Sequence, residues 1–109
     1  MSELNEFLVQ LPDKPGAAEA RQSNVQAHID HLKSLVGNGT IVMSGPTLAS
    51  HPKTATEELA VTGSSVLLRA KSEEEVRVLI SNDIYAKVGV WDLEKVTITP
   101  IKCVVRKPL

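Results

Sequence analysis

A histidine and an aspartate that lie far apart in the sequence are the residues best suited to acid–base chemistry. His28 lies within an apolar helical pattern, and Asp83 directly follows a second such pattern. Histidine gains and loses a proton near neutral pH, and a carboxylate can hold one ring nitrogen so that the other takes a proton from a substrate. Each residue also has an ordinary explanation, because buried histidines often bond to a carbonyl or a carboxylate and an aspartate after a helix often bonds to the turn.

The segment from Asn82 to Trp91 surrounds this aspartate with unusual residues. It contains Asp83 together with Tyr85 and Trp91, the only tyrosine and the only tryptophan in the chain. It connects a predicted helix to a predicted strand, and such connections often carry site residues. We therefore expect Tyr85 and Trp91 to form an aromatic wall of a substrate pocket.

A second short segment could bind a developing negative charge. Thr40 to Ser44 is a predicted strand, and we expect Gly45 and Pro46 to close it with a turn that brings main-chain amides near a ligand. Ser44 and the backbone at Gly45 could then hydrogen-bond an enolate oxygen. Ser44, Gly45 and Pro46 are accordingly candidate substrate-binding residues.

The first half of the chain predicts a strand and then a helix. The apolar run from Glu6 to Leu11 is typical of a strand, and prolines and a glycine end it. Ser23 and Gln26 match a capping box, so the firm helix should begin there and continue to about Val36. Its buried face is expected along four residues at helical spacing, widened by Leu35: Val25, Ile29, Leu32 and Val36.

The second half predicts a strand, a helix and a strand after a long loop. Residues 47–62 are expected to form a surface loop with a short helical turn near 56–59, and residues 64–70 a half-buried strand. Ser72 and Glu75 form the clearest capping box in the chain. A final strand is expected over about 94–104, with Val96 and Ile98 on one face and Pro100 marking an edge or a bulge.

This order of elements predicts an α+β fold. Strand, helix, strand, strand, helix, strand is the ferredoxin-like βαββαβ pattern, an antiparallel sheet with two helices on one face. No third helix is available to cover the other face. A second copy of the sheet is the simplest cover, which predicts a homodimer.

Composition restricts the possible functions. With 109 residues, of which 42% are hydrophobic, and a net charge of −1, residues 1–109 are expected to form a single domain that binds neither nucleic acid nor membranes. Only one cysteine is present and no secretion signal is recognisable, so a cytoplasmic location is expected.

Several short motifs together resemble the YciI-related (YCII) family of dimeric α+β barrel proteins. They are Val25 to Leu32 around His28, Ser44-Gly45-Pro46, and Asn82 to Val90, in the family's order and over roughly the whole chain. Ile84 stands where the family has proline. The resemblance implies that His28 and Asp83 act as an acid and base pair in a pocket. The family that the chain resembles includes a dehydrochlorinase of chlorinated hydroquinones, although most members have no assigned activity.

We therefore expect a lyase or isomerase acting on a small cyclic, phenolic or lactone-like molecule, without a cofactor. The alternative is a non-catalytic dimer whose pocket binds a small ligand, or an interaction module. His28 and His31 lie three residues apart and could share a metal, but no third ligand has convincing spacing. No metal site is expected, and a solvated His31 is the simpler interpretation.

Overall fold

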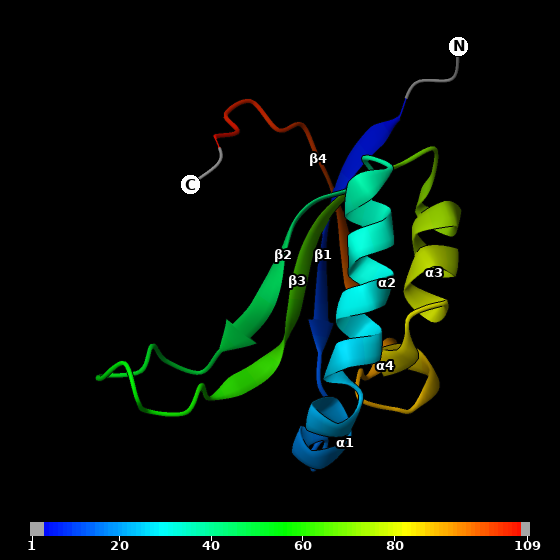
Figure 1. Ribbon diagram of the computed structural model, residues 1–109. Helices are drawn as coiled ribbons and strands as arrows, with labels where there is room; N and C mark the ends of the chain where they lie inside the picture. Colours follow the sequence, from blue (N-terminus) through cyan, green and yellow to red (C-terminus); the bar gives the residue numbers. More distant parts are fainter. Residues whose placement is uncertain (1–3, 108–109) are drawn as a thin grey trace.

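The computed structural model describes residues 4–107 and contains one four-stranded antiparallel sheet in the order β2-β3-β1-β4 (Figure 1). Along the chain the elements are β1 (Asn5–Pro12), α1 (Ala18–Ser23), α2 (Val25–Gly37), β2 (Ile41–Leu48), β3 (Val61–Ala70), α3 (Glu73–Ser81), α4 (Ile84–Lys87), a short 3₁₀ helix (Leu93–Lys95) and β4 (Thr97–Ile101). The main elements follow the predicted βαββαβ order, so the α+β, ferredoxin-like prediction is confirmed.

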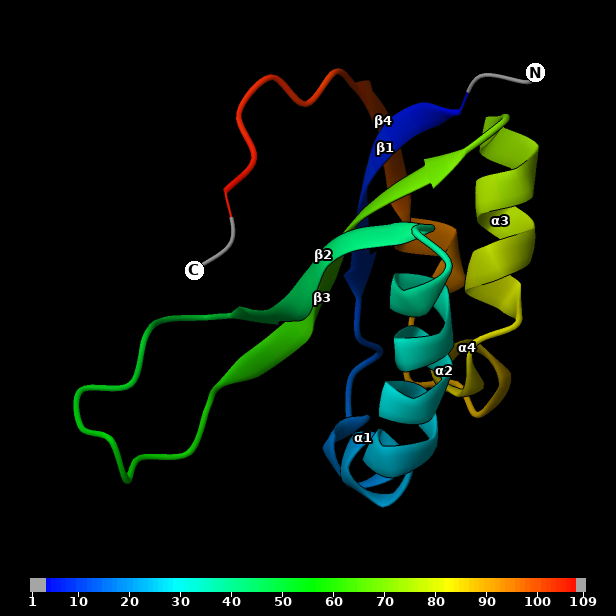
Figure 2. The same cartoon turned by 45° about the horizontal axis from the view of Figure 1, so that its top comes forward.

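The core lies between the sheet and two helices. Figures 1 and 2 show α2 and α3 side by side over one face of the sheet. Alternate residues of β1 face them, and Phe7 and Val9 pair with Leu68 and Val66 of β3. Removing such side chains from water stabilises the fold by about 1.5–3 kcal/mol each. The sheet therefore holds the helices in place through its inner face.

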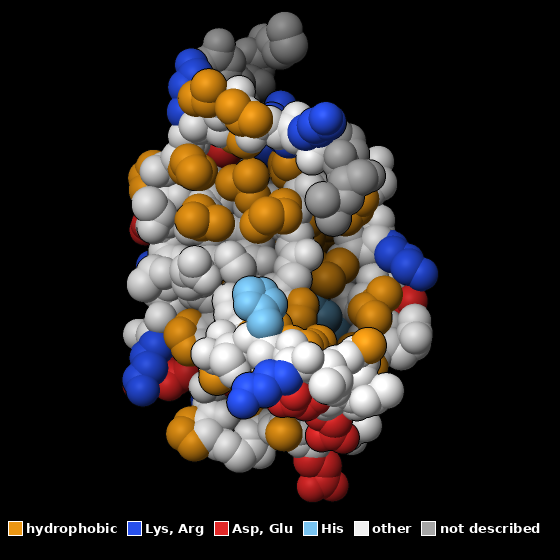
Figure 3. Space-filling view, turned by 90° about the vertical axis from the view of Figure 1, so that its left-hand side faces the viewer, with side chains coloured by type: hydrophobic (Ala, Val, Ile, Leu, Met, Phe, Trp, Pro, Cys, Tyr) orange, Lys and Arg blue, Asp and Glu red, His pale blue; other side chains and the backbone are white. Residues whose placement is uncertain are grey.

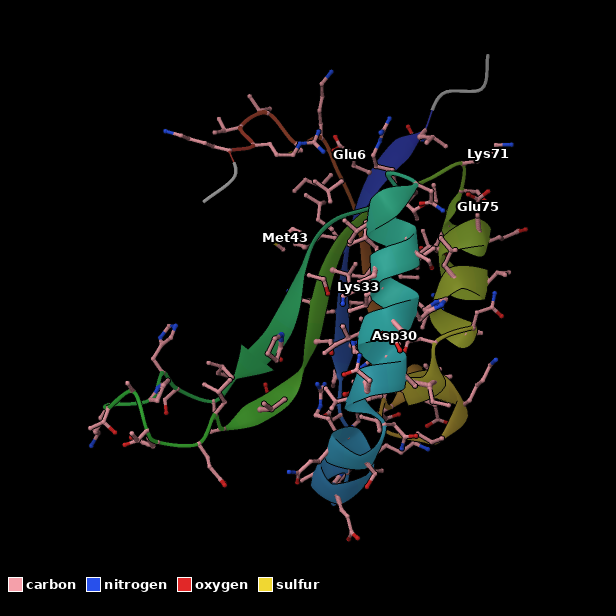
Figure 4. All side chains as sticks on the ribbon, in the orientation of Figure 1. Glu6, Asp30, Lys33, Met43, Lys71 and Glu75 are labelled. Carbon is pink, nitrogen blue, oxygen red and sulfur yellow. The ribbon has the colours of Figure 1, made fainter. Side chains whose placement is uncertain are left out.

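The outer face of the sheet carries an apolar row in which Met43 is exposed, Leu8 is half-buried and Leu67 is buried. Cross-strand pairing aligns Met43 with Leu67 and Leu67 with Leu8. Met43 is 50% exposed, and Figure 4 places it on the side of the sheet away from α2 and α3. Figure 3, viewed from the side of the β2–β3 hairpin, shows hydrophobic side chains gathered on this face.

The buried face of α2 differs from the predicted one. Val25, Ile29 and Val36 are exposed, whereas His28 is buried and Leu35 packs against the core. The helix is turned so that the line through residues 28, 32 and 35 faces the sheet. The spacing of apolar residues was compatible with two overlapping faces, and packing against the sheet selects the face that carries the histidine.

The two predicted capping boxes had different outcomes. Ser23 is the last residue of α1, a short helix that was not predicted separately, and the residue before α2 is Asn24, without a side-chain cap. Ser23 cannot cap α2 because it already lies within a helix. Ser72 does cap α3: its backbone is extended, and its hydroxyl accepts a hydrogen bond from the Glu75 amide at 3.2 Å.

The β2–β3 hairpin is longer than predicted. Gly45 and Pro46 do not form a turn, because both lie within β2 and pair with Ser65 and Ser64. The surface loop is consequently restricted to residues 49–60, and the helical turn predicted at 56–59 is absent from this described segment. The hairpin extends away from the helices as an arm (Figure 2).

The last strand is shorter than predicted. It covers Thr97–Ile101, because a 3₁₀ helix occupies Leu93–Lys95. Its faces are as expected, since Val96 and Ile98 pack against the core and Thr97 and Thr99 are exposed. Pro100 lies in an edge strand, as predicted. Within residues 4–107, no helix is long and apolar enough to cross a membrane.

Candidate functional site

His28 and Asp83 meet in the interior between α2 and α4. His28 lies on the buried face of α2 and is 8% exposed, and Asp83 is 3% exposed. The two carboxylate oxygens of Asp83 lie 2.8 and 2.9 Å from Nδ1 of His28. An ionised carboxylate can only accept, so Nδ1 carries the hydrogen and donates a hydrogen bond to Asp83. The neutral ring then has its lone pair on Nε2.

Asp83 is held in place by the local backbone. α3 ends at Ser81, and Asp83 is the N-terminal cap of the four-residue helix α4, with an extended backbone. Its Oδ1 accepts a hydrogen bond from the Tyr85 amide at 2.9 Å. The sequence pattern predicted a loop at this position. A capped helical turn orients the carboxylate despite Ile84, which stands at the proline position of the related motif.

Nε2 of His28 remains available. Among residues 4–107 no group hydrogen-bonds to this atom, and it is not one of the enclosed polar atoms without a partner. Two aromatic rings fix the imidazole around it. Tyr85 stacks on it with centroids 3.9 Å apart and planes 13° apart, and Trp91 approaches edge-on at 5.7 Å. The arrangement leaves one ring nitrogen free to act as a base.

Tyr85 and Trp91 therefore contact the histidine directly. Both are buried, and their rings pack edge to face with centroids 5.7 Å apart. Burial raises the pKa of the Tyr85 phenol above its ordinary value, and the charges of Asp83 and Asp13 add to this effect, while Arg21 partly offsets it. Tyr85 is consequently a neutral hydrogen-bond donor near pH 7.

Arg21 is a member of this cluster that sequence reasoning missed. Its guanidinium donates two hydrogen bonds to Asp13, at 2.8 and 2.9 Å, and a third to the Ser64 hydroxyl at 2.9 Å. It also lies over the Tyr85 ring, 4.8 Å from the centroid. These partners are distant in sequence, so neither spacing nor periodicity could have indicated them.

The predicted substrate-binding residues are only partly brought together. Pro46, Arg21 and Tyr85 line a cleft of about 670 Å³ between α1 and the β2–β3 hairpin, a volume typical of small-ligand sites. Ser44 is exposed on β2, and neither Ser44 nor Gly45 lines this cleft. Since Gly45 lies in a paired strand, the expected turn with free amides for an oxyanion is not present there.

His31 is less exposed than expected for a solvated residue. Its Nε2 is enclosed and has no hydrogen-bond partner among the described residues. It borders a small cavity of about 30 Å³ that Asp83 and Trp91 also line. Residues 4–107 contain no group of three His, Cys, Asp or Glu side chains arranged to hold a metal.

The chain is similar to known proteins over most of its length. The chain is 48% identical over 89 residues to "derivative of benzaldehyde biosynthesis cluster protein C" of Emericella nidulans, covering 82% of this chain and 91% of that protein. It is 37% identical over 101 residues to "fusaric acid biosynthesis protein 2" of Gibberella fujikuroi, covering 93% and 96%.

A solved structure is similar over most of the chain. It is the 5-chloro-2-hydroxyhydroquinone dehydrochlorinase TftG of Burkholderia phenoliruptrix AC1100 in complex with 2,5-dihydroxybenzoquinone. The TM-score is 0.75 and the sequence identity 31%, over 89% of this chain and 93% of that one. The family model of the YCII-related domain matches residues 6–102. The chain therefore belongs to the YCII-related domain family.

Proposed function

We propose that the protein is a lyase or isomerase that moves a proton on a small cyclic, oxygen-substituted molecule, with His28 as the base and Asp83 as its partner. The observation that supports this proposal most is the buried hydrogen bond from Nδ1 to the carboxylate, combined with a free Nε2. A structural histidine would gain from partners on both nitrogens. Within the described part of the chain, residues 4–107, only Nδ1 of His28 has a partner.

The proposed step uses the two ring nitrogens in different roles. Nε2 of His28 takes a proton from a ring hydroxyl or an activated C–H, and the electron pair of the broken bond moves into the ring. In an elimination, the proton comes from the C–H, its electron pair forms a double bond to the neighbouring carbon, and the leaving group departs from that carbon with its bonding pair. In an isomerisation, the imidazolium returns the proton to another carbon. Asp83 stabilises the imidazolium in either case, and general base catalysis of this kind contributes about 10²- to 10⁴-fold.

The surroundings of the histidine support a planar ring as substrate. Tyr85, which stacks on the imidazole, also lines the cleft of about 670 Å³, so a small ring bound in that cleft would lie next to the aromatic neighbour of the histidine. The structurally similar dehydrochlorinase binds a benzoquinone. Two relatives take their names from biosynthesis of a benzaldehyde derivative and of fusaric acid. Small oxygenated rings are therefore the substrate class to test first.

A non-catalytic role has one observation in its favour. Asp83 also caps α4 through Oδ1, so its bond to His28 could serve only to hold two helices together around a ligand pocket. Such a protein would bind a quinone without converting anything. Turnover distinguishes the two possibilities.

The decisive test is turnover in a pair of histidine variants. We expect His28→Ala to lower chloride release from 5-chloro-2-hydroxyhydroquinone, or turnover of an active compound from a panel of hydroquinones and lactones, by about 10²-fold or more. His51→Ala is the matched control, because His51 is exposed in the hairpin loop. Binding of 2,5-dihydroxybenzoquinone without turnover of any compound in the panel would favour the non-catalytic role. Equal turnover in both variants would refute His28 as the base.

We also propose that the protein is a homodimer whose copies meet through the outer face of the sheet. The exposed Met43 and the half-buried Leu8, which flank the buried Leu67 on this face, support this, because burying apolar surface is the main favourable term in association. Sedimentation velocity should give a dimer for the wild type and a monomer for Met43→Lys. A wild type that stays monomeric at high micromolar concentration would contradict the proposal.

A further inference from the structure

Arg21 holds a fixed position beside the site. Three hydrogen bonds, two to Asp13 and one to Ser64, bind its guanidinium, and the Arg21 side chain is only 15% exposed. Parallel bonds between a guanidinium and a carboxylate set the plane of the group as well as its position. A long side chain that is normally mobile is thereby made rigid.

From that position Arg21 contacts the ring that stacks on the histidine. The Tyr85 hydroxyl donates to the Arg21 carbonyl at 3.0 Å, and the Arg21 guanidinium lies 4.8 Å from the Tyr85 centroid. A guanidinium over an aromatic face is attracted by about 0.5–2 kcal/mol. Arg21 thus holds Tyr85 at two points: its carbonyl accepts from the hydroxyl, and its guanidinium lies over the ring.

The same guanidinium acts on the second ring through a shared hydroxyl. The Ser64 oxygen accepts from Nη2 of Arg21 at 2.9 Å and from Nε1 of Trp91 at 3.2 Å. Ser64 is itself 4% exposed. Both aromatic neighbours of His28 are therefore connected to Arg21, one directly and one through Ser64.

Asp83 alone cannot fix the direction of Nε2. Its carboxylate holds the imidazole at Nδ1 and the bond to Cβ holds it at Cγ, but small rotations about the side-chain torsions can still redirect Nε2 while that hydrogen bond is kept. The near-parallel stack with Tyr85 and the edge contact with Trp91 restrict that tilt. The orientation of these two rings consequently determines where the free nitrogen points.

We infer that Arg21 is a positioning residue, which orients the His28 imidazole through Tyr85 and Trp91. Its importance for turnover rests on the proposed function of the His28–Asp83 pair, whereas its effect on the orientation of the imidazole does not. A small displacement of a reacting group can cost about 10²-fold in rate. Arg21→Met keeps the apolar stem and removes all three hydrogen bonds of the guanidinium.

The orientation can be measured by NMR without any substrate. A ring proton that lies over an aromatic face is shifted upfield, so the ring protons of His28 should resonate upfield of those of exposed His51 in the same spectrum. In Arg21→Met we expect most of that shift to disappear. Arg77→Met is the matched control, since Arg77 is 56% exposed on α3 and pairs with Glu73 at 3.8 Å.

A second spectroscopic reading uses the single tyrosine. Because the Arg21 charge lowers the pKa of the Tyr85 phenol, its loss should move the ultraviolet signal of tyrosinate formation to higher pH in Arg21→Met and leave it unchanged in Arg77→Met. A folded Arg21→Met protein that keeps the upfield His28 signals would overturn the inference. If Arg21→Met does not fold, Asp13→Asn, which loosens the guanidinium and retains it, must show a partial loss of the shift for the inference to stand.

Turnover then separates this inference from the proposed function. With an active wild type, Arg21→Met should lower kcat by about 10²-fold with little change in KM. A rise in KM alone, with the His28 signals unchanged, would make Arg21 a ligand-binding residue and contradict the inference. Loss of the His28 shift in a protein without any turnover would support the positioning role and count against the proposed function.

Discussion

The site and the outer face of the sheet differ in which kind of side chain is buried. At the site, polar groups are buried and paired within one chain, as with His28 and Asp83 or Arg21 and Asp13. On the outer face, the apolar Met43 is half exposed. Buried polar groups are expensive to leave without a partner, whereas an exposed apolar side chain can be replaced at little cost. Substitutions should therefore be costly at the site and nearly neutral on the outer face.

The largest effect should come from Asp83→Ala. The change leaves Nδ1 of His28 buried without an acceptor and removes the cap of α4. We expect a loss of about 2–4 kcal/mol in the free energy of unfolding, measured by urea denaturation. Ser72→Ala is the control, because it removes only an exposed cap on α3 and should cost about 1 kcal/mol. Equal losses in the two variants would mean that the buried pair contributes nothing beyond a cap.

A smaller effect is expected from Gly63→Ala in β3. An added Cβ would collide with the Leu11 carbonyl oxygen, and it would lie 3.0 Å from the Pro12 Cα. Both contacts are to backbone, which cannot move freely, so we expect a loss of about 1–3 kcal/mol. Gly45→Ala is the matched control on the neighbouring strand, where an added Cβ meets nothing within 4 Å. The difference between the two thermal midpoints provides the measurement.

Tyr85→Phe should cost less and should change the pH dependence of stability. It removes the hydrogen bond to the Arg21 carbonyl, for about 0.5–1.5 kcal/mol at pH 8. Burial raises the pKa of the phenol in the folded state, so the unfolded chain loses this proton first as pH rises. The stabilisation that the protonated Tyr85 phenol contributes is complete below about pH 10, the ordinary pKa of tyrosine. It is lost as the pH rises from there through the raised pKa of the folded state.

The comparison of wild type and Tyr85→Phe at several pH values isolates that effect. Lysines titrate in both proteins and cancel in the difference. We expect the stability gap between wild type and variant to narrow as pH rises above about 10. A gap that stays constant to pH 11.5 would contradict the raised pKa of Tyr85.

The smallest effect should come from Met43→Lys on the outer face. Met43 is half exposed, and a lysine can keep its stem on the sheet with its charge in water. At protein concentrations low enough for a single chain, the free energy of unfolding should change by less than about 0.5 kcal/mol. A loss as large as that of Gly63→Ala would mean that this face is packed within the chain.

The elements that could be predicted are those determined by neighbouring residues. The start of α3 follows from Ser72 and three glutamates directly after it, and β1 follows from a short apolar run that prolines and a glycine end. The choice of face on α2 was wrong because it depends on the sheet, which selects the line through His28. Gly45 and Pro46 resemble a turn in isolation, and pairing with β3 keeps them in a strand.

The residues of the candidate site likewise fall into those that the sequence indicated and those that it did not. His28, Asp83, Tyr85 and Trp91 were indicated by residue type and by resemblance, and the structure brings them together. Arg21 was not indicated, because its contacts to Ser64 and Tyr85 span 43 and 64 residues along the chain. Local pattern carries no signal for contacts of that range. Ser44 lies in β2 as expected, whereas the turn expected after it is absent, because pairing with β3 continues through Gly45 and Pro46.

The most direct test of the account is the tautomer of neutral His28, read from its two ring ¹⁵N signals. We predict that Nδ1 carries the proton and Nε2 the lone pair in the wild type. In Asp83→Asn, the ring should move toward the Nε2-protonated form that histidine prefers in water. An Nε2-protonated wild type, or a tautomer that is the same in both proteins, would contradict the assignment of His28 as a base held by Asp83.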